Sequence, residues 1–139
     1  MVECIHYTAN ESWTLQPITV ANGSHSKPFG ALWASPVDSG QGWAQWCRVA
    51  GYRLGSLATA INLDISLENA LVIDSQADLC RLDWRQDGLY RYPDWESMAS
   101  RGVDVVYLTS DGLDATRWAL YGWDCESVVV LNSQAVIQS

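Results

Sequence analysis

Lysine, histidine and phenylalanine are scarce in this chain of 139 residues, which has one Lys, two His and one Phe. Eight basic residues stand against sixteen acidic ones, so the formal net charge is −8. No basic stripe remains that could grip a phosphate backbone, which argues against general binding of nucleic acid. The acidity favours solubility first, and beyond that a cationic partner or mimicry of DNA.

The four cysteines lie far apart, at Cys4, Cys47, Cys80 and Cys125, and form no C-x-x-C pair. With only two His to join them, they give little support to a zinc site, and we expect no metal. The chain shows neither a signal-peptide pattern nor an apolar run of membrane-spanning length. We therefore expect a cytoplasmic protein with four reduced thiols and no membrane association.

The common nucleotide and hydrolase motifs are missing as well. The sequence has no G-x-x-x-x-G-K-[ST] loop, G-x-G-x-x-G turn, G-x-S-x-G elbow or H-E-x-x-H helix. It is rich in large rings instead, with eight Trp and six Tyr, and such rings suit pockets and interfaces as well as cores. The apolar fraction of 48% is that of a globular chain, and the length predicts a single domain over residues 1–139.

Alternating and short apolar runs predict strands, and helical spacing with caps predicts helices. The first helix has Ser39 as a candidate N-cap and Gly51 as its stop, and the second has Ser75 as its cap with Asp78 three residues on. The predicted strands are 2–8, 30–36, 57–65, 70–74, 103–109 and 126–132, with a further edge at 135–138, and the predicted helices lie within 38–55, 75–82 and 93–102. Strands outnumber helices and mostly follow one another, which favours an α+β fold.

Three places could carry chemistry: His6 in the first strand, KPFGALWAS (27–35) and WDCES (123–127). A family pattern can be seen in four segments: IHYT (5–8), KPFGALWAS (27–35), GWAQWC (42–47) and CESVVVLN (125–132). In order and spacing they resemble the ADP-ribosyltransferase fold of poly(ADP-ribose) polymerases and diphtheria-type toxins. That family has a His-bearing first strand, a Gly-containing segment, an aromatic helix and a Glu at the head of a late apolar strand. Tyr7 stands where the family commonly has Gly. The KPFGALW and GWD segments are also similar to segments of uncharacterised bacterial and phage proteins.

The resemblance implies a split, mostly antiparallel β-sheet with flanking helices, and NAD as a substrate whose ADP-ribose is transferred to a macromolecular target. The acidic balance favours a protein as that target. Cleavage of the nicotinamide–ribose bond builds positive charge on the sugar, which a fixed carboxylate stabilises. By resemblance, Glu126 is that catalytic carboxylate, and His6 orients the dinucleotide through a ribose hydroxyl. We expect both to converge with Ser35 on one cleft.

The resemblance also implies which residues bind NAD. The backbone at Tyr7 would grip the carboxamide, and the ring of Trp33 or Tyr7 would stack on the nicotinamide, with Trp43 behind them. Ser35 would hydrogen-bond the nicotinamide ribose or the carboxamide. The full set of expected binding residues is His6, Tyr7, Thr8, Trp33, Ser35 and Trp43.

Other interpretations of the same residues stay open. The fold could be catalytically silent and hold NAD, ADP-ribose or a related nucleotide, for example as a sequestering protein in bacterial or phage conflict. A third class is an acidic interaction protein that inhibits a partner by covering its cationic surface. His6 and Trp33 could be structural, Glu126 with Asp124 could belong to a cation site with few other ligands, and Lys27 could be exposed or contact a phosphate.

Overall fold

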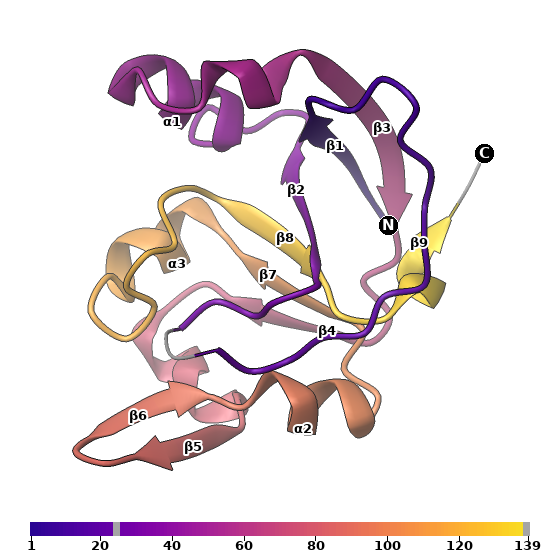
Figure 1. Ribbon diagram of the computed structural model, residues 1–139. Coiled ribbons are helices and arrows are strands. Elements are labelled where there is room, and N and C mark those ends of the chain that lie inside the picture. Colours follow the sequence, from indigo (N-terminus) through magenta and orange to yellow (C-terminus); the bar gives the residue numbers. More distant parts are fainter. Residues whose placement is uncertain (24–25, 138–139) are drawn as a thin grey trace.

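A computed structural model describes residues 1–23 and 26–137, which form an α+β structure around a seven-stranded sheet (Figure 1). Residues 24–25 of the polar segment 21–28 lie outside the described residues, as does the end of the predicted edge 135–138. The strand order is β4-β7-β8-β2-β1-β3-β9, and only β4 and β7 pair in parallel. The predicted α+β class with a mostly antiparallel sheet is confirmed. The strands are β1 (Val2–Thr8), β2 (Leu32–Pro36), β3 (Thr59–Ile65), β4 (Ala70–Ile73), β7 (Val105–Leu108), β8 (Ser127–Val130) and β9 (Val136–Ile137).

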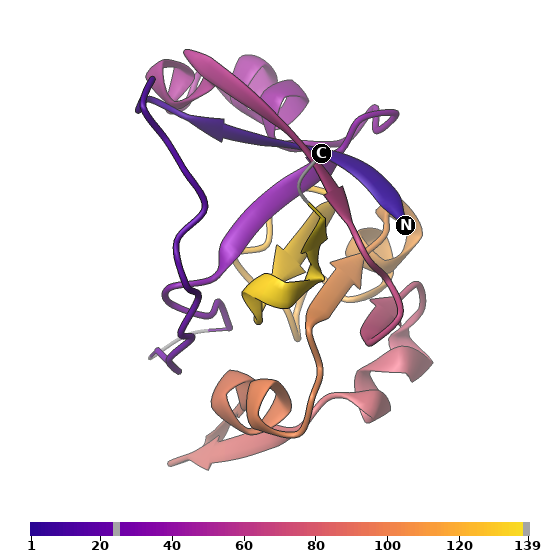
Figure 2. The same cartoon turned by 90° about the vertical axis from the view of Figure 1, so that its right-hand side faces the viewer.

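The sheet curls, and its two halves meet at a narrow junction. β1 pairs with β3 along all of its seven residues, but it pairs with β2 only through Cys4 opposite Pro36 and Ile5 opposite Ser35. Beyond Ile5 the two strands separate, so β1 and β3 run across the direction of β7 and β8 (Figures 1 and 2). His6 therefore lies where the two halves of the sheet part.

Helix α1 (Trp43–Ala50) begins later than predicted, because its N-cap is Gly42 and not Ser39. The hydroxyl of Ser39 donates to Glu126 instead. A Cβ at position 42 would lie 3.0 Å from the Cβ of Ser35, so glycine lets the helix start directly against β2. Gly51 ends α1 in the left-handed conformation, with φ of 63°, as predicted.

The two other predicted helices are present but short. The segment predicted at 75–82 is a 3₁₀ helix, η2 (Gln76–Arg81), and the carboxylate of Asp78 accepts from the Ser75 N–H at 3.1 Å, as its capping pattern predicts. Within 93–102 lies α2 (Trp95–Ser100), which Asp94 caps. Two further 3₁₀ helices, η1 (Leu54–Leu57) and η3 (Ser133–Ala135), precede β3 and β9.

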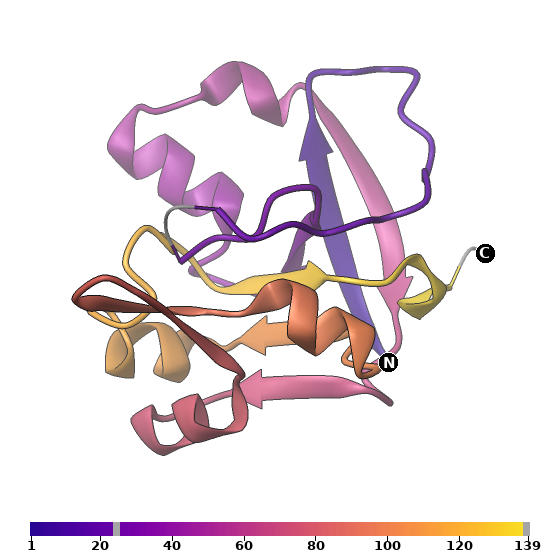
Figure 3. The same ribbon diagram turned by 60° about the horizontal axis from the view of Figure 1, so that its bottom comes forward.

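Two elements are missing from the sequence prediction. The hairpin of β5 (Trp84–Asp87) and β6 (Tyr90–Pro93) forms its own two-stranded sheet and runs beside α2 (Figure 3). Its strands are too polar to show alternation. Helix α3 (Ser110–Ala115) has Thr109 as its cap and Gly112 in its interior, where glycine weakens the helical pattern.

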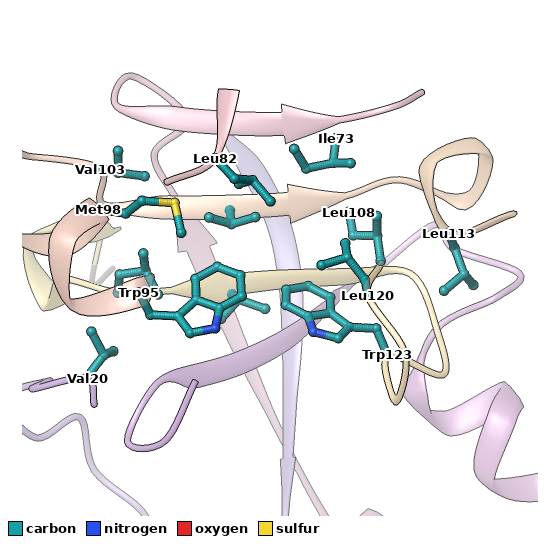
Figure 4. Close-up of a cluster of buried hydrophobic side chains, with 13 residues drawn as sticks. Val20, Ile73, Leu82, Trp95, Met98, Val103, Leu108, Leu113, Leu120 and Trp123 are labelled. Carbon is teal, nitrogen blue, oxygen red and sulfur yellow. The ribbon is translucent and has the colours of Figure 1, made fainter. Parts of the chain in front are cut away.

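Each face of the sheet has its own apolar cluster. One cluster packs α2 and the segment before β8 against β4, β7 and β8, with the rings of Trp95 and Trp123 side by side (Figure 4). The other fills the concave side with residues such as Cys4, Leu63 and Val128. All four residues of β8 are buried, which explains why its sequence is a continuous valine run without alternation. In the described part of the chain, no helix has the length and apolar character needed to cross a bilayer.

Candidate functional site

A cavity of about 310 Å³ lies between β1, β2, the start of α1 and the segments that precede β2 and β8. We call it the tryptophan pocket. Its floor is the face of β2 and β1 that carries Ser35 and Ile5, which lie opposite each other in the sheet. Five aromatic side chains line it: Tyr7, Phe29, Trp33, Trp43 and Trp123. A concave, mainly apolar site with a few polar groups is the usual form of a small-molecule pocket.

Trp33 is held as a rigid wall of this pocket. Its ring packs edge-on against Trp123 with centroids 4.8 Å apart, and Trp123 in turn stacks on the fully buried Trp95 at 5.6 Å. The indole N–H of Trp123 donates to the carbonyl of Ser26 at 3.1 Å, which ties the loop before β2 to this stack. The wall is therefore anchored in the core before any ligand arrives.

Trp43 forms a second wall at the first turn of α1. Its backbone N–H donates to the hydroxyl of Ser35 at 2.9 Å, and its indole N–H donates to the hydroxyl of Ser56 at 3.1 Å. The ring also stacks on Trp46, with centroids 5.3 Å apart and planes 16° from parallel. Ser35 lines the pocket as predicted, but its oxygen also serves as the cap that Gly42 cannot supply.

His6 lines the pocket at the point where the sheet parts. Its Nδ1 lies 2.8 Å from the carbonyl oxygen of Trp33, and its ring packs on Trp13 at 4.9 Å. A carbonyl only accepts, so Nδ1 donates this hydrogen bond, and Nε2 has no partner among the described residues. That nitrogen is available to a ligand hydroxyl. The structure thus brings His6, Tyr7, Trp33, Ser35 and Trp43 to one pocket.

Thr8 does not belong to this group. It ends β1, its hydroxyl accepts from the N–H of Asn10 at 3.0 Å, and it is not among the lining residues.

Glu126 also lies outside the pocket, although Cys125 and Ser127 on either side of it line the wall. Its side chain points to the opposite side and is only 8% exposed. The carboxylate accepts from the hydroxyls of Tyr107 at 2.7 Å and Ser110 at 3.0 Å, and from the hydroxyl of Ser39. The expectation that His6, Ser35 and Glu126 share one cleft is correct for the first two and wrong for the Glu126 carboxylate.

Burial and the nearby carboxylate of Glu126 change the pKa of neighbouring side chains. Burial, followed by the hydrogen bond to Glu126, raises the pKa of Tyr107 well above its ordinary value. Burial, followed by the charges of Asp64 and Glu126, raises the pKa of Cys4 to about 12. In the pocket wall, burial raises the pKa of Cys125 to about 11, so this thiol is neutral at pH 7.

The net charge of the groups that line the pocket has the opposite sign to the net charge of the whole chain. Lys27 and Arg53 line it, whereas Asp124 is the one acidic residue among its described lining residues. The chain as a whole has twice as many acidic as basic residues. The pocket is therefore locally cationic in an acidic protein, a property that favours an anionic ligand.

Residues 1–23 and 26–137 contain no group of three or more His, Cys, Asp or Glu arranged to hold a metal ion. The cation site considered for Asp124 and Glu126 is not formed, because the carboxylate of Glu126 is taken up by three hydroxyls.

Sequence reasoning missed several lining residues. Phe29 belongs to the segment that carries the resemblance, so it could have been named from the sequence. Cys125 and Ser127 flank Glu126. Because side chains alternate along a strand, Glu126 lies on one face of the sheet and these two residues lie on the other. Arg53 has φ of 48°, a left-handed conformation that no sequence pattern indicated for a residue other than Gly. Comparison with models of known families, with curated proteins and with solved structures finds no match.

Proposed function

We propose that the chain binds NAD or a related nucleotide containing ADP-ribose in the tryptophan pocket. The observation that carries this proposal is the meeting of anchored indole walls, the side chain of His6 and a local cationic charge in one cavity. A base or a nicotinamide ring stacks on aromatic side chains, a ribose supplies hydroxyl donors, and phosphates supply negative charge. The order of the motifs in the sequence resembles that of ADP-ribosyltransferases, which supports the same ligand class.

Titration calorimetry with NAD and ADP-ribose tests the proposal directly. Trp33→Ala removes an anchored wall, and we expect it to weaken binding by about tenfold or more, the value of one lost stacking contact. Trp118→Ala is the matched control, because Trp118 is 92% exposed and does not line the pocket. Failure of NAD and ADP-ribose to bind the wild-type chain would refute the proposal. If a basic protein then co-purified with the chain, that result would support the alternative that the chain is an acidic interaction protein.

Transfer of ADP-ribose to a protein target is a second candidate function. It is favoured by Asp124, the one acidic residue among the described lining residues of the pocket, whereas the Glu126 carboxylate points to the opposite side. Release of nicotinamide from NAD is the measurement. For a catalytic Glu126, Glu126→Gln lowers turnover by about two to three orders of magnitude and leaves ADP-ribose binding intact. Asp124→Asn tests the other nearby carboxylate, which lines the pocket.

The two variants also separate the alternatives. A loss of turnover in Asp124→Asn alone would assign the charge-stabilising role to the carboxylate that lines the pocket. If the wild-type chain binds NAD but releases no nicotinamide, the result supports a catalytically silent nucleotide-binding protein.

A further inference from the structure

Two of the eight basic residues, Lys27 and Arg53, line the tryptophan pocket, and neither forms an ion pair with a residue that the structure describes. In the described part of the chain the salt bridges join Arg101 to Asp83 and Arg117 to Asp114. The guanidinium of Arg53 lies 5.4 Å from the centre of the Tyr52 ring, and the ammonium of Lys27 lies near the Trp33 ring. What distinguishes these two cations is that both line the cavity without a carboxylate partner among the described residues.

The backbone of Arg53 is held in an uncommon conformation. Its φ of 48° makes it the one residue other than glycine with positive φ in residues 1–23 and 26–137. Its carbonyl accepts from both the N–H of Ser56 at 2.9 Å and the hydroxyl of Ser56 at 2.7 Å, and that hydroxyl also receives the indole N–H of Trp43. Strained backbone of this kind concentrates at functional sites, where the surroundings hold it.

Lys27 reaches the same cavity from the loop before β2. Its Nζ lies 5.9 Å from the centre of the Trp33 ring, and its Cε passes 3.5 Å from where a Cβ at Gly122 would stand. The lysine stem thus lies along the wall and presents its charge at the cavity.

We propose that Lys27 and Arg53 together hold a diphosphate group, so that the pocket selects nucleotides with two linked phosphates. This proposal rests on the proposed function and adds the part of the ligand that is recognised. Two cations match the two negative charges of a diphosphate, and both donate charge-assisted hydrogen bonds to phosphate oxygens. A nucleoside would gain nothing from either cation.

Titration calorimetry of the full chain with ADP-ribose, AMP and adenosine provides the test. The wild-type chain should bind ADP-ribose more tightly than AMP, and AMP more tightly than adenosine. Lys27→Met and Arg53→Met should each weaken ADP-ribose binding by about tenfold, as expected for one charge-assisted contact, and change adenosine binding less than about twofold. Both side chains are exposed, so these variants keep the fold. Arg48→Met is the control, because it makes the same change of net charge at an exposed position of α1 outside the pocket.

Three other results would overturn the proposal, and each identifies which part of it is wrong. If ADP-ribose binds and the Lys27 and Arg53 variants behave like Arg48→Met, the diphosphate site is refuted while the nucleotide-binding function stands. Equal affinity of the wild-type chain for ADP-ribose and AMP refutes recognition of the second phosphate. If none of the three ligands binds, both the diphosphate site and the proposed function fail.

Discussion

Glu126 is a buried carboxylate whose hydroxyl donors come from three separate parts of the chain. Ser39 precedes α1, Tyr107 belongs to β7 and Ser110 begins α3. The backbone N–H of Glu126 also donates to the carbonyl of Gln41 at 2.9 Å. One residue therefore fastens the loop before α1, and with it the Trp43 wall, to the sheet.

Removing this acceptor should destabilise the fold. Glu126→Ala leaves three partly buried hydroxyls without their partner, and we expect the free energy of unfolding to fall by about 3 kcal/mol in a urea titration. Asp124→Ala, at an exposed position two residues away, should stay within about 0.5 kcal/mol of the wild-type chain. Urea-unfolding curves with similar midpoints and slopes for the two variants would show that the hydrogen bonds to Glu126 contribute little to stability.

The four thiols differ in burial, and their reactivity should differ accordingly. All four cysteines are free, and Cys80 is the exposed one. Burial raises the pKa of Cys4, Cys47 and Cys125 above the ordinary value, so these thiols are neutral and shielded at pH 7. A thiol reagent should modify one cysteine quickly in the native chain and four after denaturation without reductant. Fewer than four in the denatured chain would show a disulfide.

Helix α3 is packed so closely on the end of β4 that its glycine cannot change. A Cβ at Gly112 would lie 1.8 Å from the carbonyl oxygen of Ile73, which is a backbone atom with no freedom to move aside. Gly112→Ala should therefore lower the free energy of unfolding by about 3 kcal/mol, at the upper end for an overpacked core. Gly40→Ala is the control, since nothing lies within 4 Å of its added Cβ. Thermal unfolding of both variants checks the comparison.

The two halves of the curled sheet should open separately. β7 and β8 are almost wholly buried, whereas alternate residues of β3 between Thr59 and Asn62 are exposed, and the β1–β2 junction has two residue pairs. Local opening follows the density of buried contacts. In native-state hydrogen exchange, amides of β7 and β8 should exchange last, and those at the start of β3 well before them. Uniform protection across both halves would contradict this.

Much of the fold follows from local patterns in the sequence. The strand alternation of residues 2–8, the valine run of β8, the capping pair Ser75 and Asp78, and the stop at Gly51 are all read within a few neighbouring residues. Such signals depend on backbone geometry and burial, so they predict the elements and the mostly antiparallel class. The hairpin 84–93 has a turn glycine, Gly88, and α3 has a cap, Thr109, but neither element has a clear apolar period, so the prediction missed both.

The composition of the site depends on contacts between distant residues. The sequence pointed correctly to His6, Tyr7, Trp33, Ser35 and Trp43 as neighbours in one pocket. It could not show on which side of its strand Glu126 lies, because a shift of one residue reverses every side chain and the parity is set by pairing with β2 and β7. The left-handed turn that brings Arg53 to the pocket likewise exists only because Ser56 and Trp43 hold it there. Local pattern thus specified the strands and the family resemblance named the pocket aromatics, whereas long-range packing selected the faces and the charges that a ligand meets.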